Sequence, residues 1–87
     1  MAQLTIDDLR RILREAAGDV QDIDLDGDVM DLEFEAIGYD SLALLEAGSR
    51  IERAHGITLD DGLITEAATP RDLLTAVNEV LAEADAA

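Results

Sequence analysis

No cysteine, lysine or tryptophan occurs among the 87 residues of this chain, and aromatic residues make up only 2% of it. The absence of cysteine excludes a disulfide framework and a metal site built from thiolates. Because aromatic residues are scarce, Leu, Ile, Val and Ala have to build the hydrophobic core, and this composition suits packed helices better than a sheet. We therefore expect an all-α fold.

Long apolar runs are also missing. No segment approaches the roughly 20 apolar residues that a membrane-spanning helix needs. Residues 1–14 are charged and amphipathic, and they lack the apolar region of a secretory signal. We expect a cytoplasmic protein that does not contact a membrane, with a single domain over residues 1–87 and a frayed tail over about residues 83–87.

Positive charge is scarce too. Six arginines stand against 21 acidic residues, which gives a net charge of −15. Such a field repels nucleic acid and anionic lipids, and it favours basic protein surfaces and divalent cations. A merely solubilising surface is the alternative interpretation, but so large a charge on a short chain also adds self-repulsion to the folded state. We therefore favour a monomer whose charge steers it toward basic partner proteins.

Helical patterns occupy three longer segments. Thr5 is a suitable N-cap for a helix over residues 6–17, and a second helix is expected over about residues 41–55. Thr69-Pro70 begins the last helix, because Thr is a favourable N-cap and Pro a favourable first helical residue. Its apolar stripe continues through about residue 83.

A short third helix, capped by Asp60 or Asp61, is expected before the last one. With residues 18–40 as a long first loop, these segments predict a four-helix up-down bundle of three longer helices and one short one. One short turn is expected near residues 31–34. The apolar residues expected to hold the loop on the bundle are Ile23, Leu25, Val29, Leu32, Phe34 and Ile37.

The long loop also has acidic residues at a spacing similar to that of a calcium-binding EF-hand loop. If Asp22 takes position 1, Gly27 and Glu33 take positions 6 and 12, where such a loop needs a glycine and a bidentate acid. Against this stand Met30 at position 9 and the break at Ala17-Gly18, which removes the preceding helix. We expect no metal site, and a small acidic interaction or calcium-responsive protein without a prosthetic group stays an alternative function.

The helix expected over residues 41–55 has two faces. At 100° per residue, the core face comprises Leu44, Ala47, Gly48, Ile51 and Ala54. Leu42 and Leu45 project away from that face, near Glu46 and Glu52. Leucines on a charged face indicate contact with a partner protein.

Ser41, at the junction of the loop and this helix, is the main candidate functional residue. Asp40 and Ser41 suit a helix N-terminus, and a hydroxyl at the positive end of the helix dipole can carry an anion such as a phosphodiester. A nucleophilic serine needs a base within reach, but His55 would lie roughly 20 Å away on the same helix. The nucleophile elbow is also absent, because Tyr39 and Ala43 occupy its glycine positions. We therefore interpret Ser41 as an attachment point.

At these residues the chain resembles the acyl carrier protein family. Asp40-Ser41-Leu42 matches the family's D-S-L motif, Gly38 matches a small residue shortly before it, and Glu46 matches an acidic residue five positions after the serine. The tripeptide alone is a weak signal, but the resemblance extends over nearly the whole acidic chain. Residues 31–42 look most like carriers of type II, aromatic polyketide synthases.

The resemblance implies a carrier without catalytic activity of its own. A phosphopantetheinyl transferase would attach 4′-phosphopantetheine from coenzyme A to Ser41, and the arm's thiol would hold malonyl and growing polyketide chains as thioesters in antibiotic-type biosynthesis. Further implied partners are a malonyl transferase, a ketosynthase with its chain-length factor, and a ketoreductase or cyclase. The implied docking face comprises Asp40, Leu42, Leu45, Glu46 and Glu52.

Three positions depart from carriers of fatty-acid synthesis. Ala43 stands where those proteins usually have a second acid, Ser49 replaces a bulky apolar residue, and Arg53 interrupts the acidic run. These departures weaken the acidic face that fatty-acid enzymes read. They favour polyketide synthesis, with fatty-acid synthesis as the alternative pathway.

Overall fold

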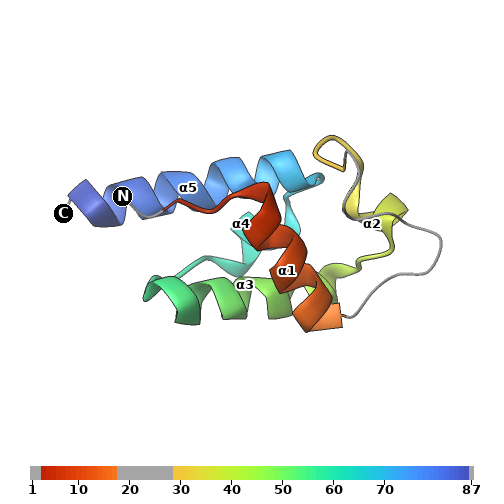
Figure 1. Ribbon diagram of the computed structural model, residues 1–87, viewed down its shortest axis with the longest axis horizontal. Helices are drawn as coiled ribbons and strands as arrows, with labels where there is room; N and C mark the ends of the chain where they lie inside the picture. Colours follow the sequence, from red (N-terminus) through yellow and green to blue (C-terminus); the bar gives the residue numbers. More distant parts are fainter. Residues whose placement is uncertain (1–2, 18–28, 87) are drawn as a thin grey trace.

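The computed structural model describes residues 3–17 and 29–86. That part of the chain is helical and contains no strand (Figure 1). Its five helices are α1 (Ile6–Ala17), α2 (Phe34–Ile37), α3 (Ser41–His55), α4 (Asp61–Thr65) and α5 (Pro70–Ala86). The all-α fold with three longer helices is therefore confirmed. No helix within the described ranges is long and apolar enough to cross a membrane.

Local capping chemistry sets the helix boundaries. The hydroxyl of Thr5 accepts a hydrogen bond from the Asp8 N–H at 3.2 Å, and the Asp8 carboxylate accepts one from the Thr5 N–H at 3.1 Å, which forms a capping box at α1. Thr69 caps α5 by accepting from the Asp72 N–H at 3.2 Å. α3 ends at Gly56, whose φ of 66° lies in the left-handed region.

The helices pack around a single core. α1 packs against α3 and α5, and the segment that contains α4 leads the chain back so that α3 and α5 run in the same direction (Figure 1). The most deeply buried side chains are Leu9, Leu13, Ile37, Ile51, Ile64, Leu73 and Val77. The side-chain amide of Asn78 in α5 holds the segment before α1. Its oxygen accepts a hydrogen bond from the Leu4 N–H at 2.7 Å, and its nitrogen donates to the Leu4 carbonyl at 3.0 Å.

Gly48 lies in the interior of α3, where a glycine usually weakens a helix. A Cβ atom at this position would overlap the Cδ1 atom of Ile64 and lie 3.2 Å from its Cγ1 atom. Glycine therefore allows the short helix α4 to approach the backbone of α3, in agreement with its predicted place on the core face.

The one-turn helix α2 was not expected, although the turn before it was. The Arg71 guanidinium donates to both carboxylate oxygens of Asp31, at 2.7 and 3.2 Å, and the Arg71 N–H donates to the Met30 carbonyl at 2.9 Å. The Phe34 N–H donates to the Ala68 carbonyl at 2.9 Å. These bonds join two segments that are far apart in the sequence, so α2 depends on tertiary contacts.

Several expectations need correction. Ala54 is exposed instead of buried, because it lines an open hollow between α1 and α3, and Leu32 is 46% exposed while its neighbours Val29 and Phe34 are buried. Asp60 takes the N-cap position of α4, yet its side chain makes no capping hydrogen bond. α5 continues past residue 83 to Ala86. Ile23, Leu25 and most of the EF-hand-like spacing lie outside the described residues.

Candidate functional site

Ser41 is the first residue of α3, and its side chain is exposed. The preceding residue, Asp40, is the N-cap, because its Oδ1 atom accepts a hydrogen bond from the Ala43 N–H at 2.9 Å. The Ser41 hydroxyl makes no hydrogen bond to the residues that the structure describes. Asp40 therefore caps the helix, while the hydroxyl of the next residue, Ser41, is exposed to solvent.

A tight connection between α2 and α3 holds this junction in place. Gly38 adopts φ 98°, a left-handed conformation that favours glycine, and its N–H donates to the Glu35 carbonyl at 3.2 Å. The Tyr39 N–H donates to the Phe34 carbonyl at 2.9 Å, and the Tyr39 side chain is buried. This left-handed conformation explains why a glycine, Gly38, stands shortly before the Asp40-Ser41-Leu42 motif.

Two hollows flank Ser41. The first, with a volume of about 450 Å³, lies on the α2 side and includes Ser41 itself. Its lining combines acidic residues with apolar ones from α2, α3 and the segment after α4: Glu33, Phe34, Glu35, Tyr39, Asp40, Leu44, Thr65, Ala67 and Ala68. An apolar group attached to Ser41 therefore has a partly apolar surface beside it.

The second hollow, of about 480 Å³, lies where the C-terminal end of α1 meets α3. Ala16, Leu42 and Ala43 give it apolar walls, and Asp40 and Glu46 give it two carboxylates. Leu42 is 76% exposed, the highest value among the large hydrophobic residues within the described ranges. The fold therefore brings together Asp40, Leu42 and Glu46, three of the residues predicted for the partner face.

Negative charge surrounds the hydroxyl. Glu33, Glu35 and Asp40 line the first hollow, Asp40 and Glu46 line the second, and all four side chains are exposed. The negative charge of Glu46 is partly compensated by Arg50, because one of the Glu46 carboxylate oxygens lies 3.3 Å from Arg50 Nε. The positive N-terminal end of α3 lies inside this ring of carboxylates, so the site combines a local anion site with a long-range acidic field.

Two residues predicted for the partner face have other positions. Leu45 is half-buried and packs against the core, so the prediction that it projects away from the core is wrong. The reason is that α3 packs against two helices, α1 and α4. Together they cover more of its surface than the single apolar stripe that the sequence predicts. Glu52 is also half-buried, and its Oε2 atom accepts a hydrogen bond from the Leu59 N–H at 2.8 Å.

Sequence reasoning missed most of the lining of the two hollows. Ala16 and Ala67 come from segments that are distant from Ser41 in the sequence, and small apolar residues carry no functional signal of their own. Glu33 and Glu35 had a weak signal, because they belong to the acidic run directly before the motif.

The residues present fit a covalently attached phosphate ester. The hydroxyl is exposed, the first-turn N–H groups of α3 have no intrahelical acceptor, and the helix dipole favours negative charge at this end. The only histidine, His55, is the last residue of the same helix, fourteen positions away, and it does not line either hollow.

Comparison with known proteins gives consistent matches. A family model described as "Phosphopantetheine attachment site" matches residues 7–77. The granaticin polyketide synthase acyl carrier protein of Streptomyces violaceoruber is 56% identical over 84 residues, which cover 97% of this chain and 99% of that protein. The actinorhodin polyketide synthase acyl carrier protein of Streptomyces coelicolor is 52% identical over 81 residues. This match covers 93% of the present chain and 94% of that protein.

Solved structures agree with the sequence matches. The actinorhodin apo acyl carrier protein from S. coelicolor superposes with a TM-score of 0.85 at 50% identity, covering 94% of this chain and 95% of that chain. The holo form of the same protein superposes with a TM-score of 0.82 at 51% identity, covering 95% and 96%. The chain therefore belongs to the phosphopantetheine-carrying proteins, and within them to the acyl carrier proteins of polyketide synthases.

Proposed function

We propose that Ser41 is the point at which 4′-phosphopantetheine is attached, and that the protein carries malonyl and growing polyketide chains without catalytic activity of its own. The observation that carries this proposal is the position of the Ser41 hydroxyl. It is exposed at the first position of α3, while the neighbouring Asp40 holds the helix cap. Family membership supports the prosthetic group, and the exposed hydroxyl at the start of α3 supports Ser41 as its attachment point.

The chain's own residues have three tasks at this site. Ser41 Oγ loses its proton and bonds to phosphorus as the pyrophosphate bond of coenzyme A breaks and adenosine 3′,5′-bisphosphate leaves. The N-terminal end of α3 stabilises the negative charge of the resulting phosphodiester. Gly38 and Asp40 hold the turn in which the serine stands. When bound, the group supplies a thiol for thioester attachment of acyl chains.

We infer that partner enzymes dock on Asp40, Leu42 and Glu46. An exposed leucine beside two carboxylates suits a basic partner surface with an apolar recess. The partners proposed are the phosphopantetheinyl transferase, a malonyl transferase, the ketosynthase with its chain-length factor, and a ketoreductase or cyclase. We leave Leu45 and Glu52 out of this face, because the first packs on the core and the second binds the Leu59 N–H.

Two further properties belong to the same proposal. A net charge of −15 opposes self-association, which supports a monomer. A free thiol on the arm requires a reducing compartment, which supports a cytoplasmic location.

Incubation with coenzyme A, Mg²⁺ and a phosphopantetheinyl transferase tests the attachment. The intact mass of the wild type should increase by one phosphopantetheine group. Ser41→Ala should show no increase, while Ser49→Ala, the matched control on the same helix, should behave as the wild type does. An unmodified wild type, or a modified Ser41→Ala variant, would overturn the proposal.

A further inference from the structure

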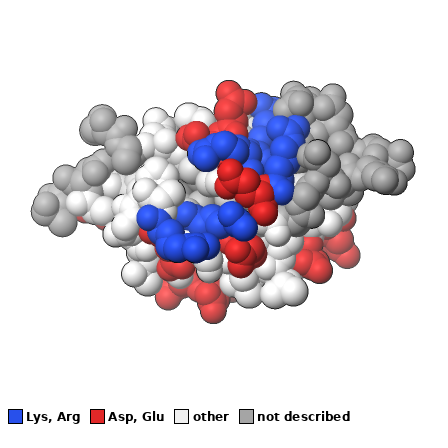
Figure 2. All heavy atoms as spheres, turned by 60° about the horizontal axis from the view of Figure 1, so that its bottom comes forward, with Lys and Arg blue, Asp and Glu red and all other residues white. Residues whose placement is uncertain are grey.

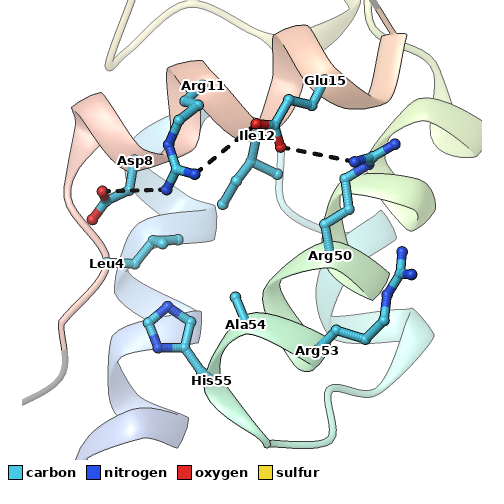
Figure 3. A pocket seen from close by; sticks show the side chains of 9 residues that line it. All are labelled: Leu4, Asp8, Arg11, Ile12, Glu15, Arg50, Arg53, Ala54 and His55. Atoms are coloured by element: carbon cyan, nitrogen blue, oxygen red, sulfur yellow. Dashed lines mark ion pairs between the residues drawn. The ribbon is translucent and has the colours of Figure 1, made fainter.

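A cationic hollow lies at the opposite end of α3 from Ser41. Arg11, Arg50 and Arg53 line it together with His55, where α1 faces the C-terminal half of α3 (Figure 3). We call it the arginine hollow, and its volume is about 480 Å³. Half of the chain's six arginines line it, but only two of its 21 acidic residues do, so its charge is opposite to that of the whole molecule.

The same face is visible in space-filling view. Arginine side chains gather on the forward surface in Figure 2, with carboxylates among and below them. The Arg11 side chain is 64% exposed and Arg53 is also exposed, whereas the Arg50 side chain is 35% exposed and its Nε atom is buried.

The ion pairs within the arginine hollow are long. The Glu15 carboxylate lies between two arginines, 4.0 Å from Arg11 and 3.8 Å from Arg50, and both distances exceed that of a hydrogen bond. Asp8 lies 3.7 Å from Arg11. Arg53 forms no ion pair with the described residues, and Figure 3 shows its side chain beside that of Arg50 without a carboxylate partner. Guanidinium donors are therefore available to an incoming carboxylate.

The composition of the lining favours a protein segment over a small phosphate compound. Leu4, Ile12 and Ala54 contribute apolar surface, which suits a side chain that brings both methylene groups and a charge. Asp8 and Glu15 at the same hollow would repel a doubly charged phosphate more than a single carboxylate. Arg guanidinium groups match the planar geometry of carboxylates.

We propose that the arginine hollow binds an acidic segment of a synthase subunit, with the ketosynthase heterodimer as the partner, and this inference rests on the carrier function proposed above. Arg53 follows Ser41 by twelve residues, roughly 18 Å along the helix. One end of α3 thus presents carboxylates beside the attachment serine, and the other end presents arginines. Two contacts of opposite sign fix the orientation of a docked protein, which a uniformly acidic surface cannot do.

The proposal is tested by whether removing the positive charge of Arg53 slows or accelerates association with the partner. Arg53→Gln makes the net charge more negative by one, from −15 to −16, and Ala82→Glu does the same at an exposed position of α5 outside the arginine hollow. If only overall charge matters, both variants should associate with a basic synthase as fast as the wild type or faster. If Arg53 meets a partner carboxylate, Arg53→Gln should associate about threefold to tenfold more slowly at low ionic strength, and the difference should shrink as salt is added.

The measurement is stopped-flow association of each holo protein with the ketosynthase heterodimer of the same synthase. An Arg53→Gln rate equal to or above that of Ala82→Glu would overturn the proposal, as would the absence of any association of the wild type. If pyrophosphate at constant ionic strength shifts the amide resonances of residues 11, 50 and 53 while Arg53→Gln associates normally, the hollow takes a phosphate ligand instead. Loading of Ser41, measured by mass beforehand, shows separately whether the carrier function holds.

Discussion

The carboxylate of Asp40 accepts a hydrogen bond from the N–H of Ala43 at 2.9 Å, one turn inside α3. This bond makes Asp40 the cap of the helix, and the Ser41 hydroxyl makes no hydrogen bond to the described residues. Modification of the serine therefore does not compete with the bond that starts the helix. The fold and the attachment chemistry depend on adjacent residues that can be changed independently.

The first prediction concerns these two residues. Asp40→Ala should lower the free energy of unfolding by about 0.5–2 kcal/mol, as loss of an N-cap does, and Asp40→Asn should cost less because its amide oxygen can still accept the bond. Ser41→Ala should stay within about 0.5 kcal/mol of the wild type, as an exposed substitution does. Urea denaturation followed by circular dichroism measures all three. Equal losses for Ser41→Ala and Asp40→Ala would contradict the division of tasks.

The three leucines of α3 give a second prediction. Leu44→Ala should cost roughly 2–5 kcal/mol, because this side chain is 5% exposed in the core. Leu42→Ala should cost less than about 0.5 kcal/mol, and the half-buried Leu45→Ala about 1 kcal/mol.

Acyl transfer to the ketosynthase should follow a different order. Leu42→Ala should slow it most, because Leu42 is the exposed apolar contact beside Asp40 and Glu46. Leu44→Ala should slow transfer only in proportion to the unfolded fraction. A Leu42→Ala variant that transfers normally would remove this residue from the docking face.

Boundaries set by local chemistry could be predicted from the sequence. Asp40, Gly56 and Pro70 mark helix ends through capping, left-handed φ and the fixed proline ring, all of which act within a few residues. The start of a helix at Ser41 could also be predicted, because the motif and the capping residue coincide there. These features need no knowledge of the rest of the fold.

Features that depend on distant segments could not be predicted. α2 is held by bonds from Arg71 and Ala68, and Leu45 is half-buried against the core in a helix that contacts both α1 and α4. From the sequence, the Glu52 carboxylate is expected to be free to contact a partner. In the structure it accepts a hydrogen bond from the Leu59 N–H. In each case a single amphipathic wheel says nothing about which neighbours will cover its edges.

A third prediction concerns the contact between α3 and α4. Gly48→Ala should destabilise the protein by about 1–3 kcal/mol despite the better helix propensity of alanine, because the new methyl group overlaps Ile64. Ile64→Val removes the Cδ1 atom that meets the new Cβ, so Gly48→Ala should cost less in that background. A double-mutant cycle of unfolding free energies measures the coupling. Equal costs of Gly48→Ala in both backgrounds would show that α4 is not held against Gly48.

A fourth prediction concerns pH. Hydrogen bonds from the backbone N–H and the hydroxyl of Thr5 hold the pKa of Asp8 below its ordinary value of 3.8, with a smaller effect from Arg11. Because the folded-state pKa is the lower one, the capping box stabilises the fold above pH 3.8, and this contribution is lost as the pH falls through the lowered pKa.

The difference in stability between the wild type and Asp8→Ala should therefore be largest near neutral pH and shrink below pH 3.8. Asp8→Asn is the control, because it keeps an acceptor oxygen but does not titrate, and its difference from Asp8→Ala should not change over that range. Thermal melts from pH 2 to pH 7 provide the comparison. A difference between the wild type and Asp8→Ala that persists unchanged at the lowest pH would contradict the role of the Asp8 carboxylate.

The most direct test of the central claim is to locate the added mass within the intact holo protein. Electron-based fragmentation of the wild type, loaded by a phosphopantetheinyl transferase, should give N-terminal fragments ending at Asp40 without the increment and fragments ending at Ser41 with it. The same spectrum should show C-terminal fragments beginning at Leu42, which contain Ser49 and Thr58, without added mass. An increment on those C-terminal fragments, or on any fragment that ends before Ser41, would contradict the assignment.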